Sequence, residues 1–165
     1  MRNVTYFKRK RLKERVGIDH FLQLWFNYHF LFFKSLISRG LKLRAFNFFL
    51  KIKKGLKNNE KFDPSFLFLI AMLKITPLLI LKPVKIGGAT YSVPFPLTYW
   101  KKISYGCRWV IKLLKDSQRV FSIDAIVESL VSSFYDEGIS LNKKKEVYHI
   151  AELNRHLIKN KVFKR

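Results

Sequence analysis

Apolar residues recur at three-to-four-residue spacing through most of the chain, which is the period of an amphipathic helix. This pattern predicts a first helix over residues 20–38, whose apolar face carries Phe21, Trp25, Tyr28, Phe32 and Leu36. Gly40 follows it, as glycine often follows the end of a helix. A second helix is predicted over about 41–54, with an apolar stripe of Leu41, Ala45, Phe48 and Ile52.

The later helices are marked by capping residues as well as by periodicity. Asp63 followed by Pro64 predicts the start of a third helix, because an N-cap carboxylate and a first-turn proline both suit that end. Pro77 ends this helix, and Ser122 and Gly138 bound a fifth one. The fourth helix has a core stripe of Ile103, Cys107, Val110, Ile111 and Leu114. The last helix, over 140–161, presents on one side Val147, Ile150, Ala151, Asn154 and Ile158.

A hairpin interrupts the helices. The stretch IGGATYSVP, residues 86–94, places two glycines between two β-leaning runs, and tight hairpin turns favour glycine because they need positive φ. Pro83, Pro94 and Pro96 exclude a central strand of a sheet. We therefore expect a two-stranded arm over about 77–97 with both edges open. Such a hairpin is marginal in water unless it lies against something.

Together these elements predict a mainly α fold, a six-helix bundle with one projecting β-hairpin arm between the third and fourth helices. We expect a basic N-terminal arm over residues 1–17 and a single helical domain over 18–165 that includes the β-arm. A length of 165 residues suits one domain with a core of ordinary size.

The charge of the chain points to its partner. Lys and Arg number 33 against 11 carboxylates, which gives a formal net charge of +22. Residues 20–59 and 64–115 contain no Asp or Glu. So much charge repels itself in a compact chain, and a polyanion is the partner that would neutralise it. At 48% apolar residues the chain is too hydrophobic for a disordered basic tail.

Two apolar stretches have features that argue against membrane spans, so no membrane partner is expected. Residues 21–33 are too few, and residues 66–81 are broken by Lys74 and Pro77, whereas a span needs roughly 20 apolar residues. The first 17 residues lack the apolar run of a secretory signal. Their basic cluster suits a short targeting segment or a nucleic-acid-binding arm.

Motifs for catalysis or metal binding are absent from the sequence. The stretch IGGAT lacks the Gly-Lys-Ser/Thr ending of a phosphate loop, and the four histidines include no pair four residues apart. The single cysteine, Cys107, is expected to be a small buried helix residue. We therefore expect no enzyme, no cofactor and no metal site.

Basic helix faces with aromatic residues among them favour nucleic acid instead. Lys101, Tyr105, Arg108, Lys112 and Lys115 share one face of the fourth helix. Lysine and arginine neutralise phosphates, and exposed aromatic rings stack on unpaired bases. Three tyrosines are candidates for such stacking, namely Tyr91, Tyr105 and Tyr148, whereas Trp109 is expected to pack in the core.

Several motifs, taken together, resemble the universal ribosomal protein S-seven family of the small subunit. The hairpin tip VKIGGATYSVP matches that family through Gly87, Gly88, Thr90, Tyr91, Val93 and Pro94. The stretch CRWVIKLLK adds Arg108 and Trp109 inside a helix, and GLKLRA adds Gly40, Lys42 and Ala45. The stretch KKKEVYHIAELNR matches the C-terminal signature through Lys143, Lys144, Lys145, Glu146, His149, Ala151, Glu152 and Asn154.

The resemblance implies a structural protein that grips the 3′ major domain of small-subunit rRNA and helps the head of the subunit assemble. Its β-arm would reach toward the exit-site tRNA and the mRNA path, and its protein partners would be neighbouring head proteins. The candidate rRNA contacts are Lys8, Arg9, Lys10, Arg11, Lys13, Arg15, Lys42, Arg44, Lys82, Lys85, Gly87, Gly88, Tyr91, Lys101, Lys102, Arg108, Lys112, Lys143, Lys144, Lys145, His149, Asn154 and Arg155.

This chain departs from the family pattern in two places. It is one residue shorter between His149 and Ala151, and the usual aromatic ending is replaced by RHLIKNKVFKR. The sparse N-terminal match and the 16 phenylalanines favour a divergent organellar member, mitochondrial or alternatively plastid. Two rival functions remain, a basic protein of a membrane surface and, ranked last, an RNA-processing factor.

Overall fold

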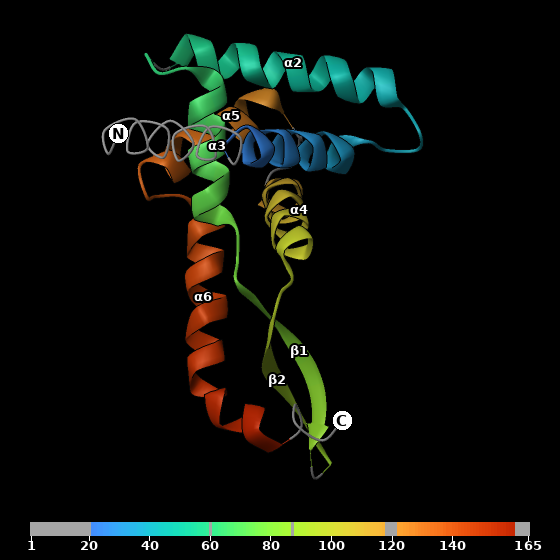
Figure 1. Cartoon of the computed structure of the whole chain (residues 1–165), viewed down its shortest axis with the longest axis vertical. Coiled ribbons are helices and arrows are strands. Elements are labelled where there is room, and N and C mark those ends of the chain that lie inside the picture. The colour runs from blue at the N-terminus through green and yellow to red at the C-terminus, as the bar shows by residue number, and fades with distance from the viewer. Residues whose placement is uncertain (1–20, 60, 87, 118–121, 161–165) are drawn as a thin grey trace, which may run out of the picture.

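The computed structural model describes residues 21–59, 61–86, 88–117 and 122–160. In these ranges residues 21–36 form a helix, which is followed by α2 (Lys42–Asn59), α3 (Pro64–Ile75), β1 (Leu79–Ile86), β2 (Ala89–Pro96), α4 (Tyr99–Ser117), α5 (Ile123–Phe134), α6 (Ile139–Leu153) and the 3₁₀ helix η1 (Arg155–Asn160). The expected mainly α fold, with six helices and a hairpin between the third and fourth, is confirmed (Figure 1).

The core is built around α3, which contacts α2, α4, α5 and α6. Its sequence is apolar on nearly every side, as expected of a helix enclosed by others. Phe68 of α3 meets Phe32 of the first helix edge to face, with ring centroids 5.1 Å apart. Cys107 is fully buried in the same core, as predicted, and burial raises the pKa of its thiol to about 12.

The second helix differs from the prediction in its length and in its buried face. It begins after Leu41, which is exposed, and runs to Asn59 rather than to residue 54. The residues it buries are Ala45, Phe49, Ile52 and Leu56. Phe48 and Phe49 are both apolar, so the sequence pattern allowed either register. The packing partner decides: a Cβ at Gly55 would lie 2.8 Å from a methyl of Val127, so α2 and α5 approach closely there.

The last helix also differs from the prediction. The α-helix ends at Leu153 and the chain continues as the tighter η1. Val147 and Ala151 of the predicted side are buried, whereas Ile150 on the same side is exposed. The change from α to 3₁₀ geometry after Leu153 alters the angle between successive side chains, so an unbroken helical period selects Ile158, whereas Leu157 is the more buried residue.

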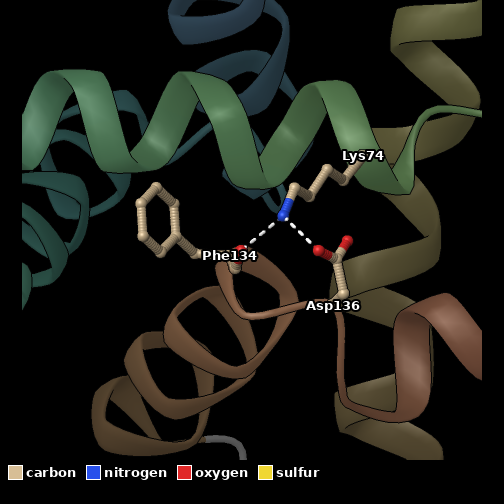
Figure 2. A network of polar contacts seen from close by, with 3 residues as sticks. All are labelled: Lys74, Phe134 and Asp136. Carbon is tan, nitrogen blue, oxygen red and sulfur yellow. Dashed lines mark hydrogen bonds and ion pairs between the residues drawn. The ribbon is translucent and has the colours of Figure 1, made fainter.

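Two lysines join three helices near their ends. The Lys74 ammonium, near the end of α3, donates to the Phe134 carbonyl oxygen at 2.5 Å and to Asp136 Oδ2 at 2.8 Å (Figure 2). The Lys144 ammonium of α6 donates to the Lys74 carbonyl oxygen at 2.6 Å. The end of α3 is therefore fixed against both α5 and α6.

The hairpin lies against α6 and η1 of its own chain (Figure 1). Its strands are antiparallel and pair Leu79 with Pro96 at the base and Ile86 with Ala89 at the tip. Val93 of β2 is buried outside the main core cluster, as are Val147, Ala151 and Leu157. The arm expected from the sequence is therefore supported along one side by the last helices.

Candidate nucleic-acid interface

A groove at the base of the hairpin gathers several of the predicted contacts. Its lining includes Lys82 and Phe95 from the two strands and Lys101, Tyr105 and Arg108 from α4. β2 leads through two residues into α4, and Lys101, Tyr105 and Arg108 stand one turn apart on that helix, so strand and helix side chains converge. The groove therefore holds three of the candidate cations beside two aromatic rings.

Two of the three cations of this groove lie over aromatic rings. The Arg108 guanidinium lies 5.7 Å from the ring centre of Tyr105, and it also donates to Ser104 Oγ at 2.8 Å. The Lys82 ammonium lies 4.9 Å from the ring centre of Phe95. No carboxylate is among the described residues that line the groove. Such cations attract phosphate, and the rings beside them offer apolar faces to a base.

The basic residues of α4 that were predicted to contact RNA differ in their exposure. Arg108 and Lys112 are exposed, whereas Lys102 is half-buried. Four residues of the predicted core stripe are buried as expected, namely Ile103, Cys107, Val110 and Ile111. The side chains of Leu114 and Lys115 lie outside the described residues, and Trp109 is half-buried.

The tip of the hairpin is open to solvent. Lys85 pairs across the strands with Thr90, and Tyr91 is 41% exposed. Gly88 has a φ of +89°, and a Cβ there would meet nothing within 4 Å. Its backbone conformation, rather than lack of space, is what requires glycine at this turn. Gly87 lies outside the described residues.

The three lysines at the start of α6 have different surroundings. Lys143 forms an ion pair with Glu146 at 2.8 Å, and both side chains are exposed. Lys144 is half-buried beneath its hydrogen bond to the Lys74 carbonyl, and burial lowers its pKa. Lys145 is exposed on the same turn. Lys145 and the ion-paired Lys143 therefore lie at the surface, whereas the Lys144 ammonium is used within the fold.

The end of α6 fastens the hairpin. Asn154 Nδ2 donates to the Ser92 carbonyl oxygen of β2 at 3.0 Å. Earlier on the same helix, the Tyr148 hydroxyl accepts a hydrogen bond from the Leu78 amide, just before β1, at 2.9 Å. The stacking role considered for Tyr148 therefore competes with a structural one. His149 and Arg155 are exposed on the same segment.

Lys42 and Arg44 lie at the other end of the molecule from the hairpin, in the first turn of α2 (Figure 1). Both are exposed, and Arg44 lines a groove with Arg39 of the preceding turn. Arg39 adopts a φ of +52° and Gly40 a φ of +77°, which closes the tight turn between the helices. The residues of the basic arm, Lys8, Arg9, Lys10, Arg11, Lys13 and Arg15, lie outside the described residues.

The prediction from the sequence missed two aromatic residues at the start of α4, next to the basic residues of the groove at the base of the hairpin. Tyr99 and Trp100 open α4 directly before Lys101 and are 45% and 56% exposed. The Tyr99 hydroxyl accepts from Asn27 Nδ2 at 3.3 Å, which ties it to the first helix. Trp100 is the more open ring for stacking, and the signal was present as two aromatics followed by two lysines at a helix start.

In the part of the chain that the structure describes, no group of three His, Cys, Asp or Glu side chains is placed to hold a metal ion. Within those same ranges, no helix is long and apolar enough to cross a bilayer.

Comparison with known proteins supports the assignment that the motifs suggested. The family model described as Ribosomal protein S7p/S5e matches residues 10–155. The chain is similar to small ribosomal subunit protein uS7 of Thermosipho africanus, at 30% identity over 78% of this chain and 85% of the relative. It is also similar to the uS7 proteins of Rickettsia bellii, at 27% identity over 75% and 76% of the two chains, and of Acaryochloris marina, at 25% over 74% and 78%.

Proposed function

Because this chain belongs to the ribosomal protein S7p/S5e family, we propose that it binds the 3′ major domain of small-subunit rRNA and nucleates assembly of the subunit head. The family is a structural, non-enzymatic component of the small ribosomal subunit.

One observation carries this proposal, the groove at the base of the hairpin. Lys82 of β1 meets Lys101 and Arg108 of α4 there, with no carboxylate among the described lining residues, and aromatic rings line the same hollow. Lysines act as point charges toward phosphate, whereas Arg108 offers a planar fork for two phosphate oxygens. Single-stranded loops and bulges of rRNA present both the phosphates and the unstacked bases that such a groove would hold.

The candidate residues divide into proposed contacts and positioning residues. We propose that RNA is contacted by the side chains or backbone of Lys42, Arg44, Lys82, Lys85, Gly88, Tyr91, Lys101, Arg108, Lys112, Lys143, Lys145, His149 and Arg155. Lys144 and Asn154 already bond to backbone within the chain, so we assign them to holding α6 against α3 and the hairpin. The half-buried Lys102, Gly87 and the arm over 1–17 stay proposed contacts on the strength of sequence alone.

The hairpin tip is proposed to approach the exit-site tRNA and the mRNA path. The hairpin is supported on α6 and η1 (Figure 1), and Lys85, Gly88 and Thr90 are exposed toward its end. We also propose that residues 1–17 act as a separate basic arm along rRNA and that 18–165 fold as one unit.

The proposed location is a mitochondrial ribosome, with a plastid ribosome as the alternative. Composition supports an organellar protein, because 16 phenylalanines and many lysines fit an A+T-rich gene. Immunoblotting of gradient-purified organelles and cytosol tests it directly. Recovery of the protein with cytosolic ribosomes alone would contradict the organellar assignment.

A salt titration of rRNA binding tests the proposed function. The full chain is titrated against the 3′ major domain of small-subunit rRNA and against a shuffled RNA of equal length. Both affinities should fall steeply with salt, because phosphate contacts release counterions. The cognate domain should bind at least about ten-fold tighter, which is roughly 1.4 kcal/mol. Equal affinity at every salt concentration would contradict the assignment to this domain.

A double variant tests the groove itself. Lys101→Gln with Arg108→Gln should weaken binding and lower the salt slope by about 1 for each lost phosphate contact. Lys54→Gln with Lys57→Gln is the matched control, since both lysines are exposed on α2 away from the hairpin. If the two double variants bind alike, the groove is not the contact that carries affinity.

A further inference from the structure

An outer face of the first two helices is covered by large apolar side chains that are open to solvent. On the helix over 21–36, Leu22, Phe26 and Phe30 stand one turn apart and are 53%, 59% and 50% exposed. On α2 the corresponding side chains are those of Leu43, Phe46 and Leu50, which are 77%, 47% and 47% exposed. Neither set belongs to the core, which takes the opposite faces of both helices.

The two stripes form one surface. Phe26 stacks on Phe30 with ring centroids 5.9 Å apart. Phe33, half-buried between the helices, meets Phe46 edge to face at 6.2 Å and so joins the first helix to α2. We call this set the phenylalanine surface, meaning Leu22, Phe26, Phe30, Phe33, Leu43, Phe46 and Leu50. Soluble proteins rarely leave so continuous an apolar surface without a partner.

The border of the phenylalanine surface is cationic over residues 21–59. Lys34 on the first helix and Arg44, Lys51 and Lys54 on α2 are exposed, and residues 20–59 contain no Asp or Glu. Beside Leu43 the surface is hollowed by a groove that Arg44 and Lys51 also line. An occupant must therefore present apolar side chains at its centre and negative charge at its edges.

Charge and polarity argue against three other candidates for covering the phenylalanine surface. A second copy of this chain would bring another net charge of +22 to a rim that is already positive. The basic arm, with seven Lys or Arg in the first fifteen residues, is repelled in the same way. RNA would satisfy the rim, but its phosphates gain nothing from an apolar centre.

We propose that the phenylalanine surface docks an amphipathic helix of a neighbouring small-subunit protein. That helix has one apolar face, and Asp or Glu residues lie along the edges of this face. Apolar residues at three-to-four-residue spacing on that helix would pack over the Phe30 and Phe46 rings, as in other helix-in-groove contacts. Its carboxylates would meet Lys34, Lys51 and Lys54, since Arg44 is among the proposed RNA contacts. This inference rests on the proposed function, because it takes the small subunit as the setting.

Photocrosslinking in assembled particles tests the proposal. The full chain is expressed with p-benzoylphenylalanine in place of Phe30, small subunits are purified, and crosslinked peptides are sequenced. We expect a protein segment with helical apolar spacing and Asp or Glu beside it. The same photoreactive group at Leu153, which is 63% exposed on α6, should not reach that segment. Crosslinks to rRNA, to a second copy or to nothing would overturn the proposal.

A pair of variants separates this proposal from the function on which it rests. The double variant Phe30→Ser/Phe46→Ser, which carries no crosslinker, should lower the amount of the neighbouring protein identified by crosslinking in purified subunits by about ten-fold. Buried aromatic anchors dominate the binding energy of such interfaces. The chain itself should stay in the particle and keep its affinity for the 3′ major rRNA domain. Ile139→Ser with Leu153→Ser is the matched control, as both residues are exposed outside the surface.

The other outcomes assign the failure to one of the two proposals. Equal loss of the neighbour in both double variants would overturn the docking role. Absence of the unmodified chain from small subunits would instead refute the proposed function. Binding of the unmodified chain to phosphatidylglycerol–phosphatidylcholine vesicles, lost in Phe30→Ser/Phe46→Ser and without any protein crosslink, would overturn the helix-docking proposal and assign the surface to a membrane.

Discussion

His29 is a buried histidine whose neighbours favour its neutral form with the proton on Nδ1. Its Nδ1 lies 2.7 Å from the Trp25 carbonyl oxygen, and a carbonyl only accepts, so Nδ1 carries the proton. Nε2 is buried, with no hydrogen-bond partner among the described residues, beside the rings of Trp25, Phe49 and Phe68. Burial, with the nearby Lys53 charge adding to it, lowers the pKa of His29 to about 4.

This lowered pKa predicts a loss of stability at mildly acidic pH. The unfolded chain takes up the proton near the ordinary histidine pKa of 6.5, whereas the folded chain resists it down to about 4. Stability from neutral His29 is therefore complete above pH 6.5, falls between 6.5 and 4, and is lost below, by up to roughly 3 kcal/mol. Urea unfolding from pH 7.5 to 4 measures it.

Two variants test this assignment, one at His29 itself and one at an exposed histidine. His29→Phe should flatten the profile in that window, whereas His149→Gln should leave it unchanged, because His149 is exposed on α6. A profile that stays steep in His29→Phe would mean that other groups, such as the carboxylates, cause the acid sensitivity.

Gly88 is a residue at which two explanations for glycine can be separated. Its φ of +89° disfavours any L-residue, yet a Cβ there has open space around it. D-alanine, introduced by ligation, adds a methyl group while keeping positive φ. If RNA comes close to the backbone at the tip, Gly88→D-Ala should weaken rRNA binding several-fold, leaving thermal unfolding unchanged. Unchanged rRNA binding would assign glycine to the turn alone.

At the scale of elements, the sequence predicted where helices and strands lie better than it predicted their contacts. The Gly-Gly turn and the prolines located the hairpin, because these residues restrict the backbone locally. On α2 the predicted Ala45 and Ile52 are buried, but Phe48 was chosen where Phe49 is the more buried ring, because the two are equally apolar and only packing against the neighbouring helices selects Phe49. The support of the hairpin depends on Asn154 and Ser92, 62 residues apart, which no local pattern encodes.

The same support predicts how the hairpin is ordered in the free protein. Asn154→Ala with Tyr148→Phe removes the bonds to the Ser92 carbonyl and the Leu78 amide. Water can replace them at these exposed positions, so the unfolding free energy should fall by only about 1 kcal/mol. Amide hydrogen exchange in the strands over 79–96 should rise, while α3 stays protected. Equal exchange in both proteins would show that apolar packing alone holds the hairpin.

At the scale of the whole molecule, the candidate site was predicted as a set of residues and not as a place. The sequence placed Lys101 and Arg108 on one face of a helix and named Lys82 apart from them, and the fold brings all three to one groove. Lys144 matched the family signature, yet the fold uses its ammonium to hold the end of α3. A sequence motif records which residues are needed, whereas burial and hydrogen bonding decide which of them face a ligand. Trp100 was missed because it lies outside the family motifs, although two aromatic residues precede two lysines there.

The net charge makes one further prediction for the isolated protein. With 33 basic and 11 acidic residues, repulsion between exposed charges opposes compaction, and the Debye length falls from about 10 Å at 0.1 M salt to about 3 Å at 1 M. Sodium chloride should therefore raise the unfolding temperature by several degrees between these concentrations while it weakens rRNA binding. The triple variant Lys51→Gln/Lys54→Gln/Lys57→Gln should be more stable than the unmodified chain at low salt and respond less to added salt. Two outcomes would contradict this prediction: an unfolding temperature that falls with added salt, or a triple variant that responds to salt as strongly as the unmodified chain. Either would show that internal packing already outweighs the charge repulsion. RNA would then be needed for recognition rather than for charge neutralisation.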